Sequence, residues 1–98
     1  MKSIISGLDK NFDSRVRLGI MSALMVNETL DFNSLKELLG TTDGNLSSHI
    51  KALEKNGMIN IFKRFISNKP NTSFCITESG KETFMKHLGA LEQLIKNK

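Results

Sequence analysis

The stretch SLKELLGTTDGNLSSHIKALEKNG, residues 34–57, predicts two short helices separated by a tight turn. Gly40 suits the left-handed residue that ends a helix, and Thr42 suits the cap of the helix that follows. We therefore expect one helix over 34–39 and a second over 43–56. Apolar residues recur in both at the spacing of one helical face, namely Leu35, Leu38 and Leu39, then Leu46, Ile50 and Leu53.

A longer helix is expected before this pair, over residues 14–26, with Asp13 or Ser14 as its cap. Its buried face is predicted from apolar residues four apart, which are Val16, Ile20 and Leu24. A very short strand can follow within 29–32. Asn33 is then the expected cap of the helix at 34–39.

After residue 57 the sequence pattern changes from that of a helix to that of a strand. β-branched and aromatic residues dominate 58–66, and alternation places on one face Ile59, Ile61 and Phe65. A turn is expected at 67–71 and a second strand at 73–76. Thr77 can cap a last helix that runs to about Lys96. The predicted fold is mainly α with a small β-hairpin (α+β).

The 98 residues are 39% hydrophobic and 24% charged, as in a small globular protein. We expect one domain over 1–98, with an N-terminal arm or short helix (1–12), a helical and hairpin unit (13–76) and a C-terminal helix (77–98). The chain has no apolar run of the length of a signal sequence or membrane span, so a cytoplasmic location is expected. Cys75 is the sole cysteine, which excludes an internal disulfide.

The net charge of +4 is concentrated in the predicted hairpin. Residues 58–76 contain Lys63, Arg64 and Lys69 and no acidic residue, so this segment contributes three of the four net charges. Such a local excess predicts an anion-binding surface, although an ordinary solubilising turn is the alternative. Strict alternation places Lys63 on the same side as Ile61.

The helix at 43–56 has a small, polar outer surface that suits the major groove of DNA. Asn45 can pair with adenine through two hydrogen bonds, serines can contact bases or phosphates, and Lys51 can neutralise a phosphate. A solvated helix face is the alternative. The predicted contacts on this helix are Thr42, Asp43, Gly44, Asn45, Ser47, Ser48 and Lys51. The hairpin is expected to contact the DNA backbone or minor groove through Arg64, Lys69 and Thr72.

Several runs together resemble winged helix-turn-helix regulators of the MarR and ArsR type. The resemblance covers roughly residues 13–90, and 42–46 (TDGNL) is similar to the start of the recognition helix in compact single-domain archaeal and bacterial members. The runs that carry it are 17–21, 38–46, 49–57, Pro70 with Thr72, and 77–80. It implies a homodimeric repressor or activator of transcription on a pseudo-palindromic operator, and of the two we expect a repressor.

The chain departs from this pattern in two ways. Members of the set often carry two or three arginines in the wing, whereas this chain has Asn68, Lys69 and Asn71. The cysteine and histidine pairs of metal-sensing ArsR proteins are absent, so metal sensing is not implied.

The last helix carries an apolar seam of the coiled-coil kind, with residues four, three and four apart. It can pack on its own domain or on a second copy, and we expect a homodimer. The predicted interface residues are Phe84, Leu88, Leu91 and Ile95, with Ile4, Ile5 and Leu8.

Catalysis has no support in the sequence, and neither a metal nor a cofactor is expected. A winged-helix protein-interaction module is the competing interpretation, because a fold does not dictate a function. Exposed apolar residues on the helix at 43–56 or on the hairpin would favour it, and Phe62 is the clear candidate. RNA binding has less support, since no aromatic stacking platform is visible. A small effector remains open, but no residue marks its pocket.

Overall fold

The structure, a computed structural model, describes residues 4–96. Within them the chain forms four α-helices, two short 3-10 helices and a three-stranded antiparallel sheet, which confirms the predicted α+β class. In chain order the elements are η1 (Ile4–Gly7), η2 (Lys10–Phe12), α1 (Arg15–Val26), β1 (Leu30–Asp31), α2 (Phe32–Leu39), α3 (Asp43–Lys55), β2 (Ile59–Ile66), β3 (Lys69–Ile76) and α4 (Glu78–Lys96).

Three of the predicted helix caps are present. The Ser14 hydroxyl caps α1 by accepting a hydrogen bond from the Arg17 backbone N–H at 3.2 Å. The Thr42 hydroxyl caps α3 by accepting one from the backbone N–H of Asn45. The Thr77 hydroxyl accepts from the backbone N–H of Gly80 at 2.8 Å. Gly40 ends α2 in the left-handed conformation, with φ of 61°.

The start of α2 differs from the prediction, because Asp31 caps the helix and Asn33 lies inside it. The Asp31 carboxylate accepts from the Ser34 backbone N–H at 2.8 Å. Pairing of β1 with β3 holds Asp31 in an extended conformation, which is the conformation that a cap requires. As a result the strand is shorter and the helix longer than expected. Leu38, which was predicted on the inward face of this helix, is exposed.

β2 and β3 form a hairpin, residues 59–76, which we call the wing. Its turn is shorter than predicted, since only Ser67 and Asn68 lie in it, both with positive φ, and β3 already begins at Lys69. With a two-residue turn, Ile66 and Lys69 form a pair joined by backbone hydrogen bonds. In an antiparallel hairpin the following pair of residues is not hydrogen-bonded to each other. Pro70 occupies that next pair and is therefore tolerated within the strand.

The core lies between α1, α3, the root of the wing and the first half of α4. At the N-terminal side, Phe12 packs edge-on against Phe84 at 5.1 Å between ring centroids, and His87 stacks beside them. The His87 Nδ1 accepts a hydrogen bond from the backbone N–H of Asp9 at 3.0 Å. A Cβ on Gly80 would overlap the carbonyl oxygen of Met58, so α4 begins in close contact with the chain that enters β2.

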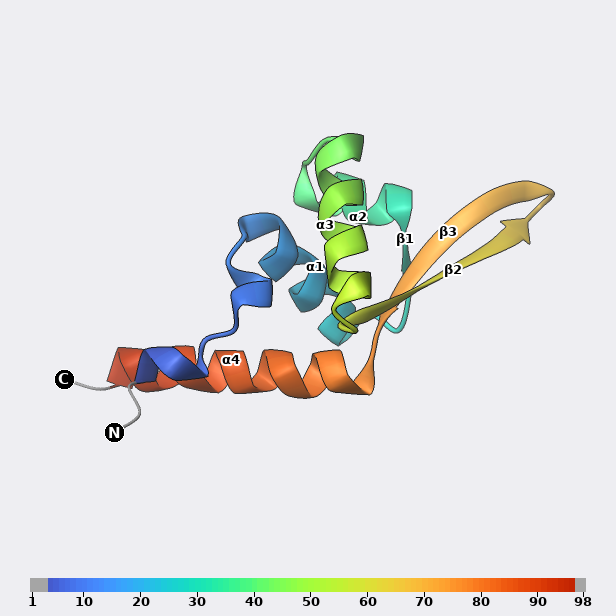
Figure 1. Cartoon of the computed structure of the whole chain (residues 1–98). Coiled ribbons are helices and arrows are strands. Elements are labelled where there is room, and N and C mark those ends of the chain that lie inside the picture. Colours follow the sequence, from blue (N-terminus) through green and yellow to red (C-terminus); the bar gives the residue numbers. More distant parts are fainter. Residues whose placement is uncertain (1–3, 97–98) are drawn as a thin grey trace.

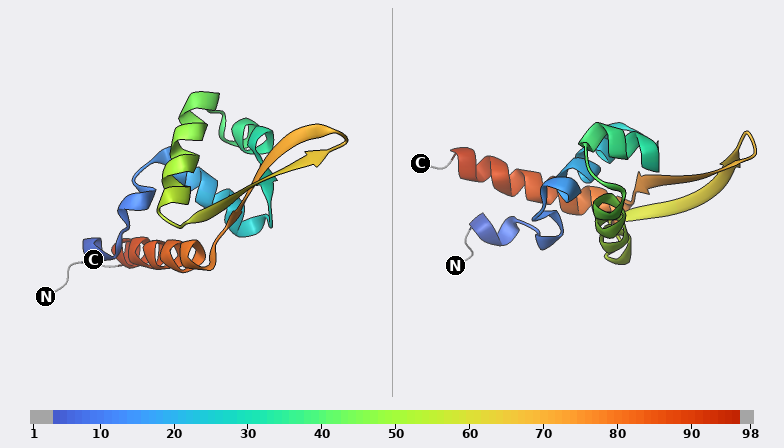
Figure 2. Two further views of the ribbon diagram at one scale, coloured as in Figure 1. Left: turned by 45° about the vertical axis from the view of Figure 1, so that its right-hand side comes forward. Right: turned by 90° about the horizontal axis from the view of Figure 1, so that it is seen from above.

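The molecule is elongated, with principal extents of 55 × 25 × 21 Å. The wing projects from one end and the C-terminal half of α4 extends from the other, and α3 stands between them (Figure 1). Both further views keep this arrangement, and η1 lies along α4 near its C-terminal half (Figure 2). Two elements therefore reach beyond the core in opposite directions.

Candidate nucleic-acid interface

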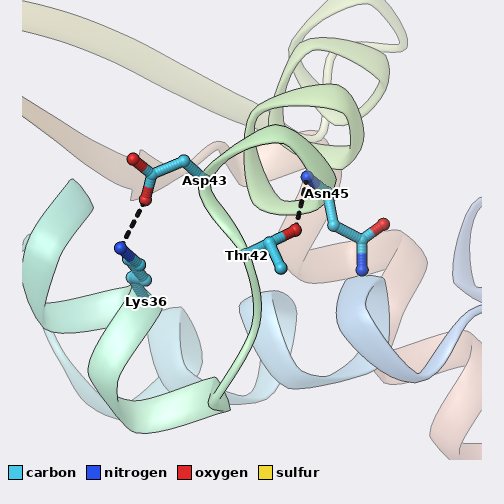
Figure 3. A network of polar contacts seen from close by, with 4 residues as sticks. All are labelled: Lys36, Thr42, Asp43 and Asn45. Atoms are coloured by element: carbon cyan, nitrogen blue, oxygen red, sulfur yellow. Dashed lines mark hydrogen bonds and ion pairs between the residues drawn. The ribbon is translucent and has the colours of Figure 1, made fainter.

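The first turn of α3 is held by a small set of polar contacts (Figure 3). The Thr42 hydroxyl accepts from the backbone N–H of Asn45 at 3.2 Å. The side-chain amide of Asn45 donates one of its two N–H groups to the Thr41 hydroxyl at 3.1 Å. The second amide N–H and the side-chain oxygen remain to make further bonds, so the arrangement is compatible with contact to a base edge.

Asp43 is an acidic residue at the leading end of α3, where it would repel a phosphate. The Lys36 Nζ lies 2.6 Å from a carboxylate oxygen of Asp43 (Figure 3), and the Asp43 side chain is largely exposed whereas that of Lys36 is half-buried. The carboxylate also interacts favourably with the helix dipole at this position. Lys36 thus balances the charge of Asp43 on the surface where DNA was predicted to bind.

The predicted contact residues of α3 are distributed over two sides of the helix. Gly44, Ser48 and Lys51 are exposed opposite the buried stripe. Asn45 instead lies on the flank towards the start of α1, beside Ser14 in a shallow cleft. Contacts to DNA through Asn45 and through Ser48 would therefore fall on different sides of the helix axis.

A groove of about 520 Å³ separates α3 from the wing. Its polar walls are Ser47, Lys51 and the acidic Glu54 from α3, and Lys63 and Thr72 from the wing. Its other lining residues are Phe32, Ile50, Ile61 and Phe74. The structure thus brings Lys63, which was not among the predicted contacts, to the same groove as Lys51. Alternation had already placed Lys63 beside Ile61, but the groove itself forms only when the wing is placed against α3.

The register of the wing assigns its cations to two faces. Lys63 is paired with Thr72 and Phe65 with Pro70, so these residues share the face that lines the groove. The other face carries Phe62, Arg64, Ile66, Lys69 and Asn71. The predicted wing contacts Arg64 and Lys69 are therefore not brought together with Thr72. The Arg64 guanidinium lies 5.6 Å from the centroid of the Phe62 ring, a cation–π contact along that second face.

The end of the wing carries exposed apolar side chains. Phe65 is 76% exposed, although alternation with Ile59 and Ile61 had predicted the buried face for it. The reason is that β2 and β3 continue past the core, so the same face that is covered at Ile59 is open to solvent at Phe65. Ile66 on the opposite face is 46% exposed, whereas Phe62, the predicted exposed aromatic, is half-buried.

Arg17 and His49 form a contact on the flank of α3 that faces away from the wing. The Arg17 Nε donates to the His49 Nδ1 at 3.0 Å. In the neutral ring this bond leaves the proton on Nε2, which is then a hydrogen-bond donor. The two residues are 32 positions apart, and the sequence alone gave no reason to pair them.

Asp31 joins the cap of α2 to the root of the wing. Besides its bond to Ser34, it accepts from the side-chain amide of Asn71 at 3.3 Å, and the Ser73 hydroxyl donates to Asn71 at 2.7 Å. The backbone N–H of Ser34 is the main reason that the pKa of Asp31 lies below its ordinary value, and the Ser34 and Asn71 side chains act in the same direction. Partial burial opposes the shift. The contacts of Asp31 therefore favour its carboxylate form, and the cap of α2 contributes most.

The predicted seam of α4 is divided between core and surface. Phe84 is 2% exposed and packs within its own chain, so it has almost no surface to offer a second copy. Farther along the helix, apolar side chains between 36% and 84% exposed continue the seam, namely Leu88, Leu91, Leu94 and Ile95. Ile5 on η1 is exposed as well, whereas Ile4 and Leu8 are half-buried.

Among residues 4–96, no group of three or more His, Cys, Asp or Glu side chains is placed to hold a metal ion. Within the same residues, no helix has the length and hydrophobicity required to cross a membrane.

Comparisons with known proteins agree with this geometry. Residues 16–95 match the family model of a winged helix DNA-binding domain. An uncharacterized protein of Methanocaldococcus jannaschii is 40% identical over 88 residues, which make up 90% of this chain and 96% of that protein. The structure of a transcriptional regulator homologue from Pyrococcus horikoshii OT3 has a TM-score of 0.78 and 33% identity, covering 93% of this chain and 95% of that one.

More distant structures share the fold. A MarR-family transcriptional regulator from Silicibacter pomeroyi has a TM-score of 0.62 at 10% identity, over 96% of this chain and 65% of that chain. An ArsR-family regulator is similar to the same degree, with a TM-score of 0.60. The likeness to MarR and ArsR regulators inferred from the motifs is thereby confirmed at the level of the fold. The chain belongs to the winged helix DNA-binding domain family.

Proposed function

We propose that this protein is a homodimeric transcriptional regulator that binds a specific double-stranded DNA sequence, with α3 in the major groove and the wing on the adjacent backbone. The observation that carries the proposal is the outer surface of α3, where Gly44, Ser48 and Lys51 are exposed. Small side chains allow the helix axis to approach base edges closely, and Lys51 adds a cation for a phosphate.

The shape of α3 and its neighbours supports this placement. The 13 residues of α3 span about 20 Å, and the major groove, about 12 Å wide, admits a helix. Lys51 and Lys63 flank the groove between α3 and the wing, so a phosphate strand beside the major groove would meet cations from both elements. Arg17 and His49 offer donors on the opposite flank.

The exposed half of the α4 seam supports a dimer. A row of large apolar side chains on a projecting helix is costly to leave in water, and a second copy of the same helix would cover it. Dimerisation would place two recognition helices on one side of a duplex, about 34 Å apart, as an inverted repeat requires. We assign repression as the sign of regulation, because occlusion of DNA needs only binding, whereas activation needs a further surface for the polymerase.

Selection from a random duplex library tests the DNA-binding proposal. We expect an enriched inverted repeat, and an affinity for it that falls steeply as salt concentration rises. If no sequence is enriched and the response to salt is shallow, the proposal fails and the protein-interaction module becomes the better interpretation.

Light scattering at micromolar concentration tests the dimer. Leu91→Glu should shift the mass from dimer to monomer, because it places a charge in the apolar row. The matched control is Gln93→Glu, which adds the same charge to an exposed position on the other side of α4 and should leave the dimer intact. A reporter gene placed behind the selected operator then gives the sign of regulation, and increased expression would contradict repression.

A further inference from the structure

The end of the wing combines an exposed aromatic side chain with three cations close to it in the strands. Phe65 is 76% exposed, and its cross-strand partner Pro70 is exposed on the same face. Lys63 and Arg64 precede Phe65 and Lys69 precedes Pro70, while the whole segment 58–76 lacks an acidic side chain. Apolar surface at this position lowers solubility, so its presence calls for a partner that covers it.

The charges decide which class of partner fits. Three cations within seven residues, with no acidic neighbour in the wing, favour a polyanion over the mixed surface of an average protein. DNA offers such a polyanion together with an apolar interior, namely the stacked faces of its bases. Side chains such as Phe and Pro enter that interior from the minor groove and unstack a base step.

The wing also has the required reach and orientation. From Ile61, beside the core, to Phe65, the strand extends about 13 Å at roughly 3.3 Å per residue. That distance is of the same order as half of the helical repeat of about 34 Å, which separates a major groove from the neighbouring minor groove. Phe65 shares the wing face on which Lys63 and Thr72 line the groove beside α3.

We propose that Phe65, supported by Pro70, inserts as an apolar wedge between base pairs of the minor groove adjacent to the site read by α3, and bends the duplex there. The inference rests on the proposed function and adds to it a specificity-determining contact. The wedge is preorganised, because Ser67 and Asn68 fix a tight two-residue turn and Pro70 restricts the backbone opposite Phe65. Specificity would arise from how easily a base step unstacks rather than from hydrogen bonds to it.

The test uses the full-length protein and the selected duplex, with 2-aminopurine placed at one base step at a time under the expected wing position. Unstacking increases 2-aminopurine fluorescence, and dyes at the two duplex ends report bending by energy transfer. Three variants are compared with the unchanged protein. Phe65→Ala removes the wedge, Phe65→Leu keeps an apolar one, and Ile66→Ala is the matched control on the other face.

The unchanged protein should increase the fluorescence at one step in each half-site and shorten the distance between the ends. Phe65→Ala should abolish both signals and weaken binding about tenfold, while the dependence on salt stays the same. Phe65→Leu should restore both signals, and Ile66→Ala should retain them.

Two other outcomes would overturn the wedge. The unchanged protein could bind the selected duplex without either signal, with Phe65→Ala binding equally well, and DNA binding would then stand without the wedge. Alternatively, Phe65→Ala could alter the mass of the protein in light scattering, which would assign the tip to a protein contact. Failure of the unchanged protein to bind any duplex would instead refute the proposed function itself.

Discussion

α3 and the wing flank one groove, yet they are built in opposite ways. α3 is fixed to the core by Leu46, Ile50 and Leu53, all almost fully buried, and its one acidic residue in the first turn is balanced by Lys36. The wing leaves the core after its first residues, and its outer half is exposed on both faces. It also carries three cations and no acidic residue.

Under the proposed function, this difference corresponds to a division of roles. Reading a base edge requires donors and acceptors at fixed positions, which a helix anchored in a core provides. Contact with a phosphate backbone tolerates a less rigidly placed cation, because the attraction is long-ranged and does not depend on sequence.

The largest effect is expected on stability. Leu46→Ala should lower the free energy of unfolding by about 2–5 kcal/mol, because it opens a cavity under α3. Ile66→Ala near the end of the wing should change it by no more than about 0.5 kcal/mol. Urea denaturation measures both variants. Similar losses would show that the wing end is as strongly anchored as α3.

The next effect is on DNA recognition. Asn45→Ala should relax base preference at one position per half-site, at a cost of about 1–3 kcal/mol for the preferred base. Lys63→Ala should weaken all duplexes about equally and reduce the salt slope by about 1. Lys86→Ala on α4 serves as the charge control and should change neither quantity. A shift in base preference on loss of Lys63 would contradict the division of roles.

A smaller effect is expected at the start of α3. Thr42→Ala should cost about 1 kcal/mol of stability, since the N–H of Asn45 loses its acceptor. Thr42→Ser keeps a hydroxyl cap and should restore the stability. Denaturation of the two variants is the measurement, and equal losses in both would show that the methyl group rather than the cap matters.

The smallest effect is the dependence on pH at the wing root. The folded-state pKa of Asp31 is lowered, so its contribution is present above the ordinary carboxyl pKa of about 3.9 and is lost as pH falls through the lower folded value. Asp31→Asn retains a cap but does not titrate. The variant should be less stable at pH 7, and its deficit should narrow below about pH 4. A deficit that stays constant with pH would contradict the role of the charge.

Local sequence signals predicted several helix ends correctly. The sequence indicated Thr42 as the cap between Gly40 and the apolar stripe of α3, and the structure uses it. Before α2, both Asp31 and Asn33 were suitable caps, so local preference could not decide between them. The pairing of β1 with β3 decided it, and that pairing joins residues more than 40 positions apart.

Periodicity has a similar limit. It grouped Phe65 with Ile59, and Phe84 with Leu91, because each pair repeats at the spacing of one face. The structure separates both pairs, since Ile59 and Phe84 lie over the core while Phe65 and Leu91 lie beyond its edge. A repeat in sequence identifies a face, but the length of the core determines how much of that face is covered.

The amino-acid sequence alone was enough to predict the order of the helices and strands, the buried stripe of α3 and the location of the positive charge in the wing. These properties depend on residue type and spacing, which act over a few positions. Only the tertiary structure brought Lys63 to the groove of Lys51, paired Arg17 with His49 and exposed Phe65 at the wing end. Those arrangements depend on how distant elements pack and on where the core ends, which no local pattern specifies.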